Sequence, residues 1–84
     1  MRKIAYTRHA QKVLERIPAN VARNIREKIA QYTAEPHTLA NNVKALKSKP
    51  GFFRLRVGDW RVVFRPTDEL VEIVDIGPRG SIYE

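Results

Sequence analysis

Three arginines in one short stretch of the chain have the residue type and the spacing that suit phosphate binding. Arg54 and Arg56 alternate along an apolar segment, and Arg61 follows the pair Gly58-Asp59. A guanidinium stays charged at physiological pH, and its planar fork of N–H groups can donate to two oxygens of one phosphate. If the fold brings these side chains together, they form a site for a polyanion.

The same stretch predicts the hairpin that would bring them together. Apolar and charged residues alternate on both sides of Gly58-Asp59, and glycine in the first position is typical of a two-residue type II′ turn. Such a turn pairs Val57 with Trp60 and places Arg56 directly opposite Arg61. Like charges that face each other destabilise a hairpin by some tenths of a kcal/mol, so stability alone does not explain the pair.

The two faces of this hairpin differ in chemistry. One carries Arg54, Arg56 and Arg61 together with Val63. The alternative to anion binding is a solvated face whose arginines pair with carboxylates, and Glu72 is the candidate carboxylate. The other face is apolar and should form the core against the helices, with Phe53, Leu55, Val57, Trp60, Val62 and Phe64.

The chain as a whole is basic. Its 84 residues include 16 Lys and Arg against nine Asp and Glu, which gives a net charge of +7. A field of that sign attracts nucleic acid, an anionic membrane or an acidic protein. Between residues 44 and 65 the only acid is Asp59. We expect further nucleic-acid contacts from the basic residues of this stretch and from one aromatic ring, namely Lys44, Lys47, Lys49, Arg65 and Phe52.

The segments before the hairpin must cover its apolar face. Residues 3–6 predict a first strand, and Thr7 is the expected N-cap of a helix that Pro18 ends. A second helix with one apolar face follows and ends before Pro36. Because the break between the two helices is short, we expect an antiparallel helix hairpin.

After the helices, residues 37–51 predict a polar, irregular connection, and residues 70–76 predict a last strand. The expected fold is therefore α+β in the order β-α-α-β-β-β. It has an N-terminal strand, an antiparallel helix hairpin and a three-stranded antiparallel meander, with the helices packed on one sheet face. The length suits a single domain over residues 1–84. The position of the first strand in the sheet stays open.

The sequence lacks the residues that several other kinds of site require. The chain has no cysteine, no metal-ligand spacing and no glycine-rich phosphate loop, so we expect neither a metal nor a cofactor. His9 and His37 have no nucleophile beside them in sequence and are expected at the surface. No segment approaches the roughly 18 apolar residues of a membrane helix. We expect a cytoplasmic protein without a membrane partner.

Three segments of the chain resemble the RelE/ParE toxin superfamily of type II toxin–antitoxin systems. They are residues 42–47, the hairpin sequence GFFRLRVGDWRVVF at 51–64 and the closing IGPRGSIY at 76–83. Element order and length agree over essentially the whole chain. The hairpin is the specific part of the resemblance, which is closest to the RelE-type mRNA interferases.

The resemblance implies a metal-independent endoribonuclease that cleaves messenger RNA on the ribosome and inhibits translation. In RelE-type nucleases the 2′-hydroxyl of the message attacks the adjacent phosphate. The family's functional positions are filled here by Arg54, Arg56, Arg61, Arg79 and Tyr83. The resemblance assigns phosphate stabilisation to Arg61, the leaving group to Arg79 and substrate orientation to Tyr83. Arg54 and Arg56 would hold backbone phosphates.

One departure from the family concerns the general base. The best-known members have lysines at the positions of Arg54 and Arg56, and an arginine in practice cannot lose its proton. Either catalysis rests on electrostatics and alignment, or another residue accepts the proton.

The resemblance also implies a partner, a cognate antitoxin in a toxin–antitoxin hetero-oligomer. An acidic segment with an amphipathic helix would suit this basic chain, over the helices or over the arginine face. Two alternatives to the nuclease stay open: a ParE-like inhibitor of DNA gyrase that acts by binding, and a catalytically inactive antitoxin-binding module. The sequence specifies neither the codons cut nor the stoichiometry.

Overall fold

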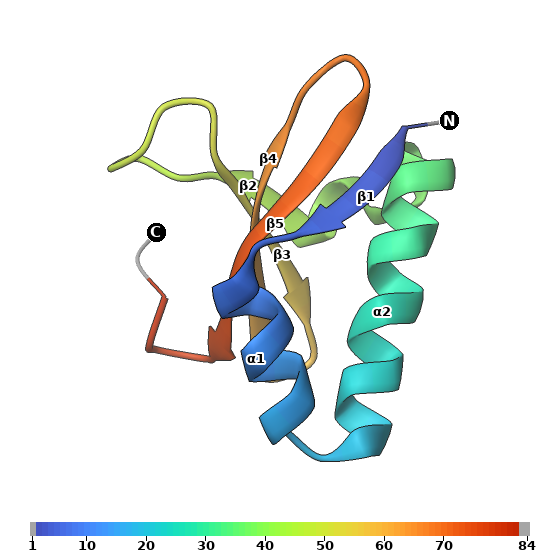
Figure 1. Ribbon diagram of the computed structural model, residues 1–84. Coiled ribbons are helices and arrows are strands. Elements are labelled where there is room, and N and C mark those ends of the chain that lie inside the picture. The colour runs from blue at the N-terminus through green and yellow to red at the C-terminus, as the bar shows by residue number, and fades with distance from the viewer. Residues whose placement is uncertain (1, 83–84) are drawn as a thin grey trace.

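The computed structural model describes residues 2–82 and shows two helices against one face of a mixed five-stranded sheet (Figure 1). This arrangement confirms the predicted α+β fold and its helix hairpin. The elements in chain order are β1 (Lys3–Tyr6), α1 (Arg8–Arg16), α2 (Ala19–Ala34), the 3-10 helix η1 (Pro36–Asn42), β2 (Val43–Ala45), β3 (Phe53–Val57), β4 (Trp60–Pro66) and β5 (Leu70–Pro78).

The strand order in the sheet is β1-β5-β4-β3-β2. The last three strands form the predicted antiparallel meander. The first strand, whose position the sequence left open, lies at the sheet edge and runs parallel to β5, with Ile4 opposite Val71. Strands β1 and β5 therefore pair in the sheet although residues 7–69 separate them in the sequence.

The connection after α2 is more ordered than expected. Residues 37–51 were predicted to be irregular, but they contain most of η1 and the short strand β2, which pairs with β3 through Val43 and Leu55. A three-residue strand is too short to show a period of two, and its pairing depends on a strand that comes later in the chain. Leu39 and Leu46 are buried and hold this connection against the rest of the molecule.

The last strand is also longer than predicted. It was expected to stop at Ile76, yet it runs to Pro78, because Gly77 and Pro78 still lie opposite Arg61 and Trp60 of β4. Proline lacks an N–H donor and is tolerated at such a strand end.

The core lies between the two helices and the sheet. Each residue of the predicted apolar hairpin face belongs to this core or packs against it, so that prediction is confirmed. The Phe64 ring lies at its centre, 1% exposed, with its centroid 4.8 Å from that of Tyr32 and 5.9 Å from that of Phe53. Aromatic rings at these separations add to the stabilisation that burial alone provides.

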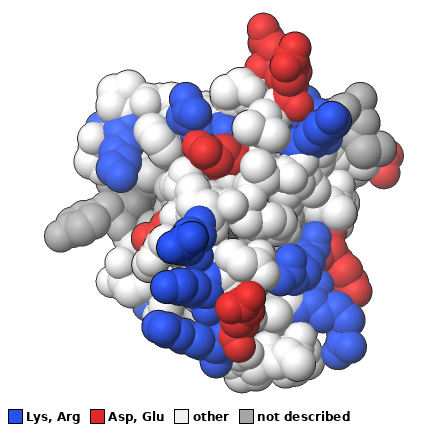
Figure 2. Space-filling model, viewed as in Figure 1, with Lys and Arg blue, Asp and Glu red and all other residues white. Residues whose placement is uncertain are grey.

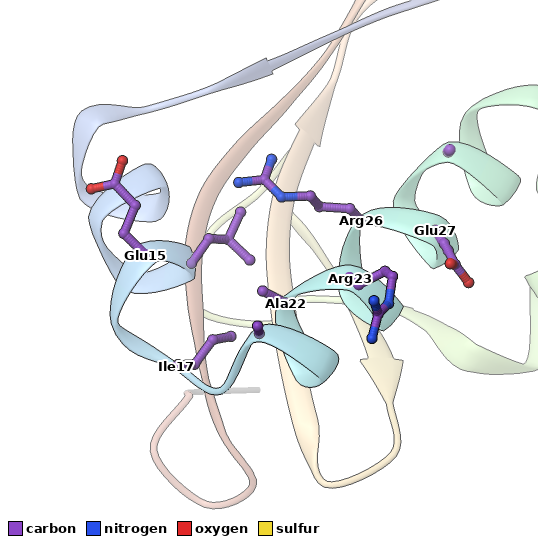
Figure 3. A pocket seen from close by; sticks show the side chains of 9 residues that line it. Glu15, Ile17, Ala22, Arg23, Arg26 and Glu27 are labelled. Atoms are coloured by element: carbon purple, nitrogen blue, oxygen red, sulfur yellow. The ribbon is translucent and has the colours of Figure 1, made fainter.

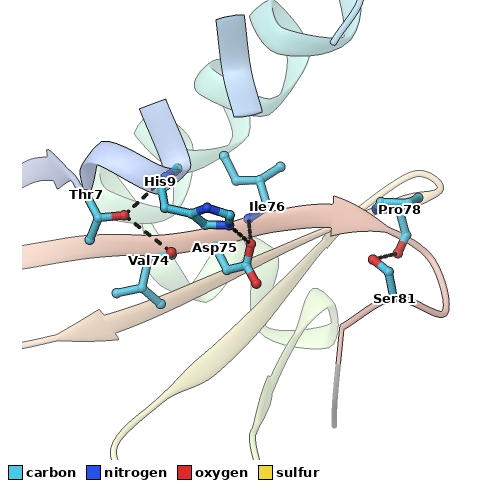
Figure 4. Close-up of polar contacts among 8 residues, drawn as sticks. Thr7, His9, Val74, Asp75, Ile76, Pro78 and Ser81 are labelled. Carbon is cyan, nitrogen blue, oxygen red and sulfur yellow. Dashed lines mark hydrogen bonds and ion pairs between the residues drawn. The ribbon is translucent and has the colours of Figure 1, made fainter. Parts of the chain in front are cut away.

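Thr7 ties the start of α1 to the sheet. As predicted, its hydroxyl caps the helix by accepting from the Ala10 amide at 3.1 Å. The same hydroxyl donates to the carbonyl of Val74 on β5 at 3.3 Å (Figure 4). Helix and strand are thereby fixed at one point.

In the described part of the chain, no helix is long and apolar enough to span a membrane.

Replacing Phe64 with alanine should lower the free energy of unfolding by about 3–5 kcal/mol, since it leaves a cavity in the core. The matched control is Phe52→Ala, because Phe52 is only half-buried and is not part of that core. Its loss should cost less than about 2 kcal/mol. Urea denaturation of both variants measures the difference, and equal costs would contradict this description of the core.

Candidate functional site

The hairpin of β3 and β4 has the predicted register. Val57 lies opposite Trp60, and Arg56 lies opposite Arg61. Gly58 has φ +59, and no non-glycine residue among 2–82 has a positive φ. A positive φ only at the first turn residue is the pattern of a type II′ turn. The like-charged pair is therefore a feature of the fold and does not depend on a shifted register.

A polar pocket of about 530 Å³ opens beside this turn, and three of the predicted arginines line it. They are Arg56 from β3, Arg61 from β4 and Arg79 from the segment after β5. Gly58 and Asp59 of the turn and Asn42 of η1 complete the lining. Residues that are far apart in sequence thus bring guanidiniums to one place.

Carbonyl groups of the turn hold the Arg61 side chain. Its Nη1 donates to the carbonyl oxygen of Gly58 at 3.0 Å and to that of Trp60 at 3.1 Å. Within residues 2–82 neither Nε nor Nη2 of Arg61 donates to the protein, so both can donate to a bound anion. A guanidinium fixed in this way needs little reorganisation to bind a phosphate.

The turn also fixes the backbone at Arg79. Its amide donates to the carbonyl of Asp59 at 2.7 Å, which joins the segment after β5 to the hairpin. Ser81 closes the next turn, since its hydroxyl donates to the Pro78 carbonyl at 2.8 Å (Figure 4). Position 83, where Tyr83 was predicted to orient the substrate, lies outside the described residues.

Arg54 differs from the other three arginines. Its position on the non-core face is as predicted, opposite Val63 and Lys44, but it is only 7% exposed and does not line the pocket. Leu46 and Phe52 lie on the same side of the sheet and line a separate, more apolar pocket there. Alternation along a strand predicts the face of a residue, but it does not predict what a distant loop places over it.

The outlying residues predicted to bind nucleic acid fall into two groups. Lys44, Lys47 and Lys49 are exposed on β2 and the following loop, and the Lys49 ammonium lies 5.4 Å from the centre of the Phe52 ring. Arg65 instead pairs with Glu72 across β4 and β5, with 3.3 Å between Nη2 and Oε1. Glu72 therefore neutralises Arg65, and not the arginines of the pocket.

Two polar side chains of the pocket were not among the predicted site residues. Asn42 donates from Nδ2 to the Arg56 carbonyl at 3.3 Å, and Asp59 is the one acid among the described residues that line the pocket. Asn42 belongs to a 3-10 helix that sequence patterns did not reveal. Asp59 carried a signal, because it is the single acid in a basic stretch, but a turn role accounted for it.

His9 is exposed, as predicted, but it has a partner. Its Nε2 lies 2.9 Å from Oδ1 of Asp75, and the same oxygen accepts from the Ile76 amide (Figure 4). This contact links α1 to β5. Among residues 2–82, no group of three or more His, Cys, Asp or Glu side chains is arranged to hold a metal ion.

A second surface feature is the groove between α1 and α2 (Figure 3). Its floor is apolar, with Leu14, Ile17 and Ala22. Its charged lining has both signs, with Arg23 and Arg26 of α2 and the acids Glu15 and Glu27. Figure 2 shows basic side chains over this side of the molecule, with acidic ones between them. The groove is thus suited to a partner with an apolar stripe that is flanked by charges of both signs.

Comparisons with known proteins agree with the fold and show the family of the chain. A family model described as the ParE toxin of the type II toxin–antitoxin system parDE matches residues 4–83. No sequence among the curated proteins matches the chain.

Solved structures of similar fold include two toxin–antitoxin complexes. The archaeal RelE–RelB complex from Pyrococcus horikoshii matches with a TM-score of 0.78 and 23% identity, over 96% of this chain and 98% of that one. The E. coli RelBE complex matches with a TM-score of 0.76 and 17% identity, over 93% and 96%.

The isolated E. coli RelE toxin also shares the fold, with a TM-score of 0.77 and 16% identity over 98% of this chain and 88% of that one. The family match spans nearly the whole chain, and the similar structures have the same fold. This chain therefore belongs to the RelE/ParE superfamily and is a toxin of a type II toxin–antitoxin system.

Proposed function

We propose that this toxin is a metal-independent endoribonuclease that cleaves messenger RNA on the ribosome and so inhibits translation. The observation that carries the proposal is the pocket in which Arg56, Arg61 and Arg79 meet. Three guanidiniums in one pocket repel one another, and a phosphodiester backbone offers the charge that relieves this repulsion. The similarity of the fold to RelE structures supports the same proposal.

The proposed reaction is attack of a 2′-hydroxyl on the adjacent phosphorus, which gives a cyclic phosphate and a free 5′-hydroxyl. Negative charge grows on the phosphate oxygens in the transition state, where preorganised donors stabilise it. Arg61 fits this role, because the turn carbonyls hold it in place. Arg79 would lie at the leaving oxygen, and Arg56 would bind the neighbouring phosphate.

The other predicted residues have less direct roles in this proposal. Tyr83 would orient the substrate, and Arg54 would add positive charge from beneath the face. Lys44, Lys47 and Lys49 would extend the contact with messenger or ribosomal RNA, and Phe52 offers a ring for stacking. Arg65 contributes least, because Glu72 offsets its charge.

Gly77 allows the segment that carries Arg79 to lie close to the sheet. It sits opposite Arg61, and a Cβ at this position would lie 2.6 Å from the Ser81 hydroxyl and 3.0 Å from Cδ1 of Ile82. The first distance is too short for any real Cβ contact. A side chain at position 77 would therefore require the side chains of Ser81 and Ile82 to shift, and we propose that this shift also displaces Arg79, which lies in the same segment.

A cognate antitoxin is the partner proposed for this toxin, in a hetero-oligomer. The similar structures include complexes named for RelB antitoxins. An antitoxin with an apolar helix could use the groove between α1 and α2 (Figure 3), and acidic residues could cover the arginine pocket.

A second candidate function is inhibition of DNA gyrase by binding. It is favoured by the family match, whose description names ParE. Inhibition of gyrase by binding needs no catalytic residues and would not account for the set of arginines in the pocket. That set therefore favours the nuclease. A third candidate is a catalytically inactive module that serves only its antitoxin.

Addition of the toxin to a translating extract should produce messages whose new 5′ ends are in phase with codons. Arg61→Ala should reduce cleavage by about 10²–10³-fold, since it removes a preorganised donor. The matched control is Arg65→Ala, an arginine of the same strand outside the pocket, which should cleave within a few-fold of the wild type. Mapping of message 5′ ends provides the measurement.

Other outcomes of this assay would contradict the nuclease. Intact messages with an accumulation of cleaved DNA would favour gyrase inhibition. Intact messages and intact DNA would favour the inactive module. Equal losses in the two arginine variants would show that the pocket is not the site.

Gly77→Ala should lower cleavage by about 10²-fold, because a shift of the order of 1 Å at a catalytic group has that effect. Adding Ser81→Ala should restore part of the rate, since the closest clash is with the Ser81 hydroxyl. Thermal unfolding of each variant separates displacement of Arg79 from loss of the fold. Full activity of the Gly77→Ala variant would show that the segment accommodates the added methyl group without moving Arg79.

A further inference from the structure

We propose that Asp59 is the general base that takes the proton from the attacking 2′-hydroxyl, an inference that rests on the proposed nuclease function. Arginines stand where the best-known relatives have lysines, and an arginine in practice cannot act as a base. Among residues 2–82, Asp59 is the only acid that lines the arginine pocket. Within this part of the chain it is therefore the one carboxylate in the pocket that can accept a proton.

The backbone around Asp59 is fixed by the same residues that would bind the phosphate. Its carbonyl accepts from the Arg79 amide at 2.7 Å. The carbonyl of Gly58, one residue earlier, accepts from the Arg61 guanidinium at 3.0 Å. The root of the Asp59 side chain thus keeps a set position relative to both arginines, as alignment of a base with a reacting group requires.

The carboxylate of Asp59 is also available. Over residues 2–82 it forms no hydrogen bond or ion pair, although three arginines line the same pocket. Other acids of the sheet are engaged: Glu72 pairs with Arg65, and Asp75 contacts His9 and the Ile76 amide. Asp59 is exposed, so an incoming hydroxyl can reach its oxygens.

The proposed step moves one proton to Asp59 and exchanges one bond at phosphorus for another. The 2′-hydroxyl proton moves to the Asp59 carboxylate while the 2′-oxygen forms a bond to phosphorus. The bond between phosphorus and the 5′-oxygen breaks, and the leaving oxygen takes a proton from water. The products are a 2′,3′-cyclic phosphate and a 5′-hydroxyl, and Asp59 returns its proton to solvent. Arg61 and Arg79 stabilise the charge on the oxygens of the phosphate throughout.

The competing explanation is that Asp59 serves only the turn. Asp and Asn are both common in two-residue hairpin turns, and glycine is accepted there too. Asp59→Asn and Asp59→Gly therefore keep the turn but remove the proton acceptor. The bond from Arg79 uses the backbone carbonyl of Asp59, so both variants retain it.

The test is single-turnover cleavage of a message on purified ribosomes over a range of pH, with the wild type, Asp59→Asn and Asp59→Gly. We expect Asp59→Asn to slow cleavage by about 10²–10⁴-fold, the usual contribution of a general base. Its binding to ribosomes should change by less than about threefold, because the arginines remain.

Two further readouts distinguish a base from a turn residue. The residual rate of Asp59→Asn should rise about tenfold per pH unit, as hydroxide replaces the missing base, whereas the wild-type rate should change little near neutral pH. Added formate should restore part of the rate of Asp59→Gly, because it returns a carboxylate to the vacated space.

The inference is overturned if Asp59→Asn cleaves within about threefold of the wild type with an unchanged pH profile, and the nuclease proposal survives that result when Arg61→Ala is inactive. A wild-type toxin that leaves the message intact overturns both proposals. Loss of activity without a changed pH profile and without formate rescue would assign Asp59 to the turn alone.

Discussion

The site depends on two backbone carbonyls of one tight turn. The carbonyl of Gly58 accepts from the Arg61 side chain, and that of Asp59 accepts from the Arg79 backbone. These bonds keep two cationic residues beside a third, Arg56, although their charges repel. The opposing stabilisation comes from the far side of the hairpin, where Phe64 and its neighbours are buried against the helices. The fold therefore maintains a concentration of positive charge that isolated strands would not.

The arginines of the hairpin strands differ in the residues that lie opposite them. Arg65 has Glu72 opposite it and is neutralised in place. Arg56 and Arg61 lie opposite each other, and the acid that lines their pocket is Asp59, whose carboxylate forms no ion pair within residues 2–82. Positive charge is therefore left uncompensated at one end of the sheet, and the proposed function requires an anion to bind at this end. The strand register determines which arginine lies opposite an acid, and the turn holds Arg61 in place.

Local patterns predicted much of this arrangement. Alternation and the Gly58-Asp59 turn were sufficient for the hairpin register, the apolar face and the pairing of Arg56 with Arg61. Long-range contacts decided what the sequence could not show. Strand β1 lies beside β5, the connection after α2 contains a short strand, and Arg54 is buried. Each of these features depends on segments that are distant in the chain. The alternation of residues along a strand predicts only the two faces of that strand.

The proposed function requires that RNA phosphates bind at the pocket beside the turn. The most direct measurement is an NMR titration of backbone amides with a 2′-O-methyl oligoribonucleotide, which cannot be cleaved because its attacking hydroxyl is blocked. If phosphates bind there, the largest chemical-shift changes occur at Asn42, residues 58–61 and Arg79. Shifts concentrated on α1 and α2, or spread evenly over the basic surface, would contradict it.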